Sequence, residues 1–154
     1  MTPDLLTALT SGTYWGIVGI ALLLIGVTVG LHYEVLQRLN CAIPRSRLPP
    51  RRRVLLLIFG ILAAHTVEIW IFGVGLHLAT LHPAFGSIGG AAHHELLDSI
   101  YLSATTYTTV GYGDLVPHGP IRFLLGLEAL TGLVLITWSA SFTYLEMRRY
   151  WKVR

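Results

Sequence analysis

The sequence predicts an all-α membrane protein in which three transmembrane helices are joined with a short re-entrant helix and a non-helical loop. Two observations come from composition: 53% of the 154 residues are hydrophobic, and only 12% are charged, against about 25% in soluble domains. The mean hydropathy is +0.63. The third observation is a glycine-containing segment between the second and third apolar runs, Thr108 to Asp114. Long uncharged runs of this kind are typical of membrane proteins.

The first uncharged run extends from Leu5 to Leu31, which is longer than the roughly 20 residues a helix needs to cross the hydrocarbon core. It is preceded by no basic residue, so we interpret it as a retained span and not a cleaved signal. We assign residues 1–37 to this first helix. Its glycines recur on one face and predict close approach of another helix: Gly12, Gly16, Gly19, Gly26 and Gly30.

A basic cytoplasmic linker is expected over 38–53. Its prolines predict a break in the helix: Pro44, Pro49 and Pro50. Its six arginines either only fix the orientation of the chain or also bind anionic lipid at the inner leaflet. Cys41 is the one cysteine of the chain, so no intrachain disulfide is possible.

The second span, 54–80, contains Glu68 and, three residues earlier, His65, which share a helix face. Glu68 lies about 21 Å along the helix from Val54 at 1.5 Å per residue. An ionisable residue at this depth should face protein and have a partner. Two interpretations stay open: a brace or proton-sensitive latch behind the loop, or an ordinary polar contact between helices.

An irregular external loop over 81–92 precedes a short amphipathic segment, 95–107, which is too short to span the bilayer. Glu95 and Asp98 lie in its first turns, where they suit the helix dipole. We interpret it as a re-entrant helix whose C-terminal end favours a cation. A tight turn at Pro117–Pro120 leads to the third span, 121–147.

The basic residues predict the orientation of the chain. Ten of the eleven Lys and Arg residues lie in 38–53 or 148–154, and Arg122 is the exception. Both basic segments therefore belong on the cytoplasmic side of the cell membrane (plasma or inner membrane), with the N-terminus outside. The loop 108–114 then enters from the outside.

The core of this loop reads T-V-G-Y-G, Thr109 to Gly113. A row of backbone carbonyls can face one side only if the backbone takes alternating, partly left-handed dihedrals, which Gly111 and Gly113 tolerate. Non-helical backbone at membrane depth must be buried in protein or line a water path. A pore formed by several chains satisfies both conditions.

This segment resembles the ion-coordinating loop of potassium channels, and 54–150 resembles the two-helix pore module of prokaryotic members with one extra helix in front. The resemblance implies a homotetramer that conducts K⁺ passively, with K⁺ ions bound in the filter and no organic cofactor. It implies ion sites at the carbonyls of 109–112 and the Thr109 hydroxyl: Thr109, Val110, Gly111 and Tyr112, followed by Gly113.

The resemblance also implies supporting residues. Thr108 and Asp114 flank the filter, and Tyr101 matches an aromatic position that braces Asp114. Many relatives carry a carboxylate where this chain has Thr105, so we expect Glu68 or Glu128 to supply the bond that holds the filter. Gln at either site should then weaken conduction.

On the third span, Gly132 matches a hinge glycine of the family or is a packing glycine. The residues below it recur on one face, which either lines the inner cavity or packs on the second span: Leu133, Ile136, Ala140 and Tyr144.

Other functions were weighed against the potassium channel: a non-selective cation channel and a non-conducting membrane adaptor. An enzyme and a nucleic-acid binder are not expected, because no set of nucleophile and base is present and the basic clusters flank membrane spans.

Several histidines fall on the external side, where they either sense acid or are ordinary loop residues: His77, His82, His93, His94 and His118. Only the short segment 148–154 follows the third span, so we expect gating by the membrane, ions, pH or a partner.

Overall fold

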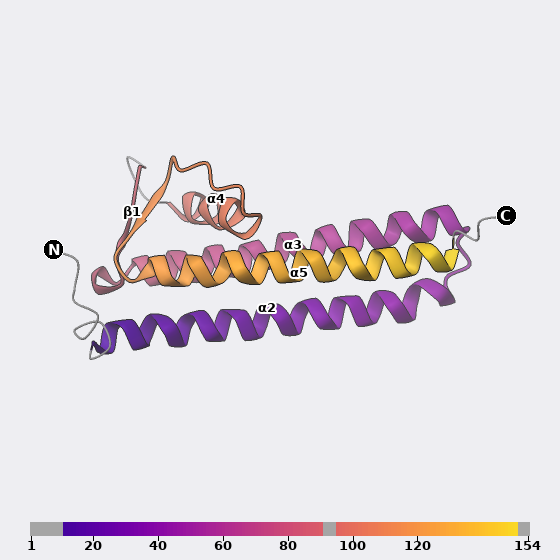
Figure 1. Ribbon diagram of the computed structural model, residues 1–154, viewed down its shortest axis with the longest axis horizontal. Coiled ribbons are helices and arrows are strands. Elements are labelled where there is room, and N and C mark those ends of the chain that lie inside the picture. The colour runs from indigo at the N-terminus through magenta and orange to yellow at the C-terminus, as the bar shows by residue number, and fades with distance from the viewer. Residues whose placement is uncertain (1–10, 91–94, 151–154) are drawn as a thin grey trace.

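The computed structural model describes residues 11–90 and 95–150, so the predictions for Leu5 to Thr10, His93, His94 and 151–154 lie outside the described residues. Three long helices run side by side: α2 (Gly12–Arg45), α3 (Pro50–Thr80) and α5 (Ile121–Tyr150) (Figure 1). All three are long and apolar enough to cross a membrane. A short helix, α4 (Leu96–Tyr107), lies against one end of the group. The predicted all-α membrane fold is confirmed.

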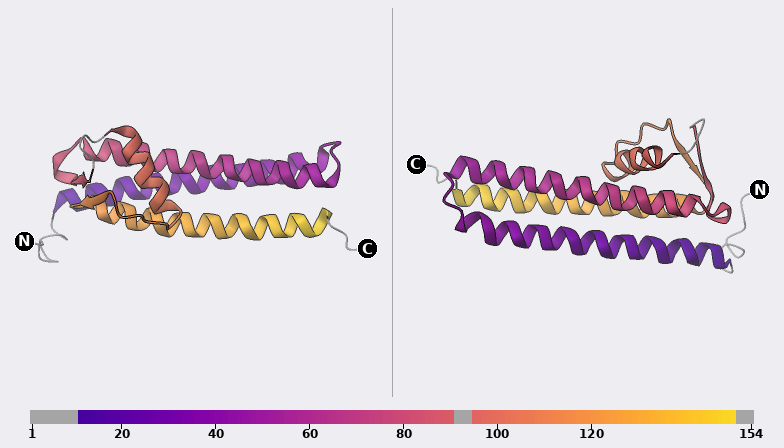
Figure 2. Two further views of the ribbon diagram at one scale, coloured as in Figure 1. Left: turned by 90° about the horizontal axis from the view of Figure 1, so that it is seen from above. Right: turned by 180° about the vertical axis from the view of Figure 1, so that it is seen from behind.

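The two ends of this bundle differ. Helix α4 and the loop that follows it lie at the end where α2 begins, on the side of α3 and α5 that faces away from α2 (Figures 1 and 2). The connection from α2 to α3 and the end of α5 lie at the opposite end. The arginines of 45–53 and 148–149 are therefore far from the loop 108–114, as the charge pattern predicts.

The break between the first two helices is shorter than expected. Helix α2 continues to Arg45, with Pro44 inside its last turn, and Pro50 already begins α3. Packing explains the difference, because Leu36 and Ile43 of α2 are buried against the start of α3. Pro50 occupies the first helical position, where its missing N–H costs nothing. The linker expected over 38–53 is thus reduced to residues 46–49.

The external connection is more regular than the sequence suggests. A 3-10 turn, η1 (Pro83–Phe85), leads into β1 (Ser87–Gly89), which pairs antiparallel with β2 (Val116–His118). Gly86 has φ 122°, and a Cβ atom there would lie 2.0 Å from the carbonyl oxygen of His118. The irregular loop and turn predicted on either side of α4 therefore contribute the two strands of one small antiparallel sheet.

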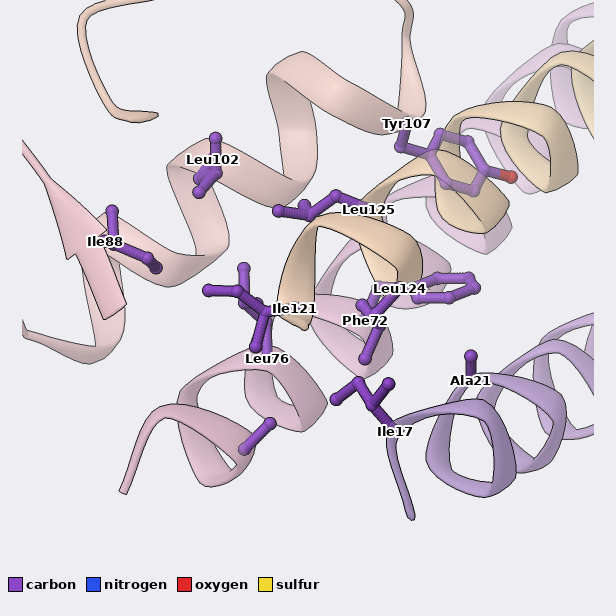
Figure 3. Close-up of a cluster of buried hydrophobic side chains, with 11 residues drawn as sticks. Ile17, Ala21, Phe72, Leu76, Ile88, Leu102, Tyr107, Ile121, Leu124 and Leu125 are labelled. Atoms are coloured by element: carbon purple, nitrogen blue, oxygen red, sulfur yellow. The ribbon is translucent and has the colours of Figure 1, made fainter. Parts of the chain in front are cut away.

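Helix α4 begins at the acidic residues singled out in the sequence. Glu95 is the N-cap, and its side chain and that of Asp98 form a reciprocal capping box with the backbone. The helix ends at Tyr107, immediately before the loop. Its apolar face joins the main core, formed by all four helices and β1 (Figure 3). Ile17 and Ala21 belong to this core, so α2 folds together with the other helices.

The glycine stripe of α2 faces away from this core. The buried residues of α2 lie on the opposite face of the helix: Ile17, Ala21, Thr28, His32, Leu36 and Ile43. A Cβ atom added at Gly12, Gly19, Gly26 or Gly30 would meet no atom of the described chain within 4 Å. Gly16 alone of the stripe approaches a neighbour, the ring of Phe85. The predicted close helix approach at this stripe is therefore not made by α3 or α5.

Close approach to the backbone of α4 occurs at two glycines of α3 and α5, whereas Gly60 and Gly75 of α3 lie against side chains of α2. A Cβ atom at Gly73 would lie 2.7 Å from Cα of Ile100, and one at Gly132 would lie 2.1 Å from the carbonyl oxygen of Tyr107. These glycines let both α3 and α5 touch the backbone of α4. Gly132 therefore has a packing role, whether or not it also acts as a hinge.

This contact predicts the effect of one methyl group. Gly132→Ala should separate α5 from the end of α4 and destabilise the protein by about 1–3 kcal/mol, as other overpacked sites do. Gly126→Ala, on the same helix, is the matched control, because nothing lies within 4 Å of its added Cβ. Thermal unfolding of both variants in detergent checks this. Equal melting temperatures would contradict the packing role.

Candidate ion-binding loop and its supports

The loop after α4 has the backbone alternation that a row of carbonyls requires. Thr109, Gly111 and Gly113 have φ values of 61°, 55° and 80°, so every second residue is left-handed. The start of the loop is tied to the last turn of α4, because the N–H groups of Thr109 and Gly111 donate to Thr106 and Thr105 at 2.9 and 3.0 Å. Thr109 holds this conformation without being glycine, which L-residues rarely do.

The loop is uncovered within one chain. All residues from 108 to 114 are exposed, and the side chains of Val110 and Tyr112 are 55% and 73% exposed. The sequence predicts that these two side chains pack outward and hold the loop open. Within the described chain, the rings of Tyr112 and Tyr101 are stacked with centroids 6.5 Å apart.

Tyr101 also contacts the residue after the filter. Its hydroxyl donates to Oδ2 of Asp114 at 2.9 Å. This bond raises the pKa of the Tyr101 phenol, because it stabilises the protonated form beside a carboxylate. Tyr101 thereby connects the exposed face of α4 to both Tyr112 and Asp114, at the outer end of the loop.

A buried carboxylate of α5, that of Glu128, contacts α4 and supports it. Ser103 of α4 lies 2.5 Å from Oε1 of Glu128 and 2.9 Å from the carbonyl oxygen of Ile69 on α3. A hydroxyl has one proton and cannot donate to both oxygens. A protonated Glu128 that donates to Ser103, which in turn donates to Ile69, satisfies both contacts. Glu128 is fully buried, and burial favours this neutral arrangement over a charged one.

The second buried carboxylate, Glu68 of α3, supports the other end of α4. Its Oε2 accepts from the Tyr107 hydroxyl at 2.5 Å, and its side chain contacts two histidines, His65 and His32. Both carboxylates named in the sequence analysis thus bond to α4, and they do so at Ser103 and Tyr107 and not at the filter backbone. Thr105, at the position where relatives carry a carboxylate, is buried and bonds to its own helix at Leu102.

The lower part of α5 presents a mixed face. Leu133, Ala140 and Tyr144 are exposed in the chain, whereas Ile136 packs partly on the core. Helix α5 passes through Gly132 without interruption. The lining of a cavity by this face stays a prediction, and so does the hinge.

Among the external histidines, His82 accepts a bond from the backbone of Ala84, and His118 lies in β2. His77 lies in the last turn of α3.

At the other end of the bundle, Arg53 donates to the carbonyls of Ser46 and Leu48 at 2.7 and 2.8 Å and so stabilises the connection between α2 and α3. This arginine has a structural use beyond topology or lipid binding.

Sequence reasoning missed three partners of the buried carboxylates, namely His32, Ser103 and Tyr107. It also missed Ser139, which contacts His32. His32 offered a signal, since it is a polar residue at the end of a long apolar run. The hydroxyl groups offered none, because Ser and Tyr at such positions are common in membrane helices without a specific partner.

Comparison with known proteins agrees with this geometry. The features above define a membrane pore unit: two spanning helices that hold a re-entrant helix and a carbonyl loop. A model of the ion channel family matches residues 54–147, from the start of α3 to near the end of α5. The chain belongs to this family, which is a family of channels and not of enzymes.

Two relatives are similar over the same fraction of the chain. The inward rectifier potassium channel Kirbac3.1 of Paramagnetospirillum magnetotacticum is 40% identical over 63 residues, which cover 40% of this chain and 21% of the relative. Protein LctB of Geobacillus stearothermophilus is 41% identical over 61 residues, covering 40% of this chain and 44% of the relative. The chain thus spans less than half the length of either. No solved structure matches it.

The two carboxylates should differ in their response to amidation. Glu68→Gln replaces one of the two carboxylate oxygens, which contact His32, His65 and the Tyr107 hydroxyl, with an N–H₂ group. A buried polar group that is left without a partner costs about 1–3 kcal/mol. Glu128→Gln keeps a donor that can serve Ser103. We therefore expect a lower melting temperature and weaker current for Glu68→Gln, and a near-normal Glu128→Gln, which revises the sequence expectation for Glu128.

The control is Glu34→Gln, since Glu34 is exposed and forms only a loose 3.8 Å pair with Arg38. Equal losses at Glu68 and Glu128 would contradict the different proton arrangements inferred for them.

Proposed function

We propose that the chain forms a potassium-selective channel in which four copies surround one axis and K⁺ passes through the loop 109–113. The observation that carries this proposal is the loop itself: left-handed dihedrals at every second residue, in a T-V-G-Y-G sequence, on backbone that one chain leaves uncovered. In this arrangement the carbonyls of 109–112 and the Thr109 hydroxyl replace the water shell of the ion.

The need for several copies follows from the membrane. A non-helical segment cannot face lipid, because each unsatisfied backbone group costs several kcal/mol there. In one chain all residues of the loop from 108 to 114 are exposed. Neighbouring copies of the same loop would cover these residues and supply the further carbonyls that a ring around an ion needs. In potassium channels four such loops form the filter, and each chain here has one loop, so the analogy gives four chains.

The non-selective channel differs in one measurable property. Purified protein in planar bilayers, with K⁺ on one side and Na⁺ on the other, should give a reversal potential near the K⁺ equilibrium value. A reversal potential near zero with robust current would favour the non-selective pore instead. No current from a protein shown to be tetrameric would favour a gated pore that lacks its stimulus, or the adaptor.

A filter variant tests the role of the backbone directly. Gly113→Ala places a Cβ at φ 80°, a conformation that L-residues rarely adopt, although nothing lies within 4 Å of that Cβ inside one chain. We expect K⁺ over Na⁺ selectivity to fall at least tenfold, with the helices intact by circular dichroism. Gly126→Ala is the control and should conduct as the parent does.

We further propose that the N-terminus and filter face the outside of the cell membrane, and that the arginine-rich end faces the cytoplasm. Because Cys41 is the only cysteine, a Cys41→Ala background permits single-cysteine mapping. A membrane-impermeant maleimide should label Ser87→Cys, but not Arg47→Cys, in intact cells. Both positions are exposed in the chain. Labelling of Arg47→Cys but not of Ser87→Cys would show the opposite orientation.

A further inference from the structure

A buried polar cluster joins α2 to α3 inside the membrane region. His32 of α2 and Glu68 of α3 are both fully buried, and the His32 Nδ1 lies 2.8 Å from Glu68 Oε1. His65, one turn before Glu68, places its Nδ1 2.9 Å from Glu68 Oε2, and its side chain is 14% exposed. The ion-conduction function uses Glu68 only as a support, so two histidines on a carboxylate need a further explanation.

We propose that His32, His65 and Glu68 form a binding site for a divalent transition-metal ion, of which Zn²⁺ is the best match. Their ligand atoms all lie within 4.8 Å of one another. Two imidazole nitrogens and one carboxylate oxygen form a donor set that binds Zn²⁺ in proteins with a fourth position left for water or another ligand. A histidine and a glutamate at i and i+3 on one helix, facing a ligand from a second helix, is a known way to build metal sites in helix bundles.

The side chains must rearrange before an ion fits between them. Donors placed about 2.0–2.2 Å from a tetrahedral zinc ion lie roughly 3.3–3.5 Å from one another. The two histidines contact different oxygens of Glu68 at the hydrogen-bond distances of 2.8 and 2.9 Å, and the three ligand atoms lie within 4.8 Å of one another. Each ring must also carry its proton on Nε2, so that Nδ1 can bind the metal.

Outer partners are already in place for such a site. The Ser139 hydroxyl of α5 lies 3.3 Å from Nε2 of His32, where it can accept the N–H of a ring that binds metal through Nδ1. The Tyr107 hydroxyl bonds to Glu68 Oε2 and lies 3.0 Å from Nδ1 of His65. It can keep its bond to the carboxylate, but it must move off the His65 nitrogen when that nitrogen binds the ion. The Ser139 contact orients His32 before the ion arrives.

The site connects α2 to the filter. Tyr107 is the last residue of α4, two positions before Thr109, and Ser139 belongs to α5. An ion between His32, His65 and Glu68 would clamp α2 to α3, and through Tyr107 it would fix the base of the filter loop. Helix α2 thereby acquires a role in stabilising the pore.

The test uses the full chain, purified in detergent and freed of metal with a chelator. Co²⁺ is the probe, because its visible absorption reports coordination by nitrogen and oxygen ligands. We expect one Co²⁺ per chain, with intense tetrahedral bands that Zn²⁺ abolishes by displacement. His32→Gln should lose these bands, since its amide still donates to Glu68 but is a poor ligand. His118→Gln is the matched control, because His118 is exposed in β2, and this variant should retain the bands.

A second variant guards against misfolding of His32→Gln. Ser139→Ala leaves all three ligands in place and removes one outer partner, so it should weaken Co²⁺ binding about 10–100-fold. The proposal is overturned if no such bands appear up to millimolar Co²⁺, or if His118→Gln abolishes them while His32→Gln does not. Unchanged binding in both His32→Gln and Ser139→Ala overturns it as well. These spectra need no ion flux, so the metal site and the potassium-channel proposal can fail separately.

Discussion

The structure depends on one constraint, which is that backbone without internal hydrogen bonds cannot lie in lipid. Three helices satisfy their own backbone, but the loop 108–114 is non-helical and exposed in the single chain. Its first residues are bonded to the end of α4, and the small sheet of β1 and β2 connects the segments on either side of α4 and the loop.

Helix α4 is too short to hold its position by spanning the membrane, so side contacts must fix it. Close backbone contact at Gly73 and Gly132 lets α4 lie near α3 and α5, and buried polar contacts fix the orientation of α4. Glu128 reaches α4 at Ser103, whereas Glu68 reaches it at Tyr107. Each spanning helix of the pore module therefore contributes one glycine and one carboxylate to the same short helix. Inside a low-dielectric region, such bonds are strong when complete and costly when broken.

Much of this could be predicted from the sequence, because the signals are local. Apolar length gives the three spans, Glu95 and Asp98 mark the start of α4, and the glycines of the loop mark its backbone. The remainder depends on tertiary contacts. Burial of Ile43 against α3 carries α2 past the expected break, and pairing with a segment beyond α4 makes β1 a strand. The partner of Glu68 on α2 lies 36 residues away, and no spacing rule links them.

Helix α2 shows why the two faces of one helix must be interpreted separately. Its glycines suggested the packing face, yet the buried face carries larger residues and His32. A glycine stripe favours close approach only where a partner helix is present, and α3 and α5 bind α2 through side chains instead. Since Ile17 and Ala21 share the core with α4 and α5, and His32 bonds to Glu68, α2 is coupled to the same contacts that position the filter. A change in how α2 packs would therefore reach the loop 108–114 through Glu68 and Tyr107, without passing through the sheet of β1 and β2.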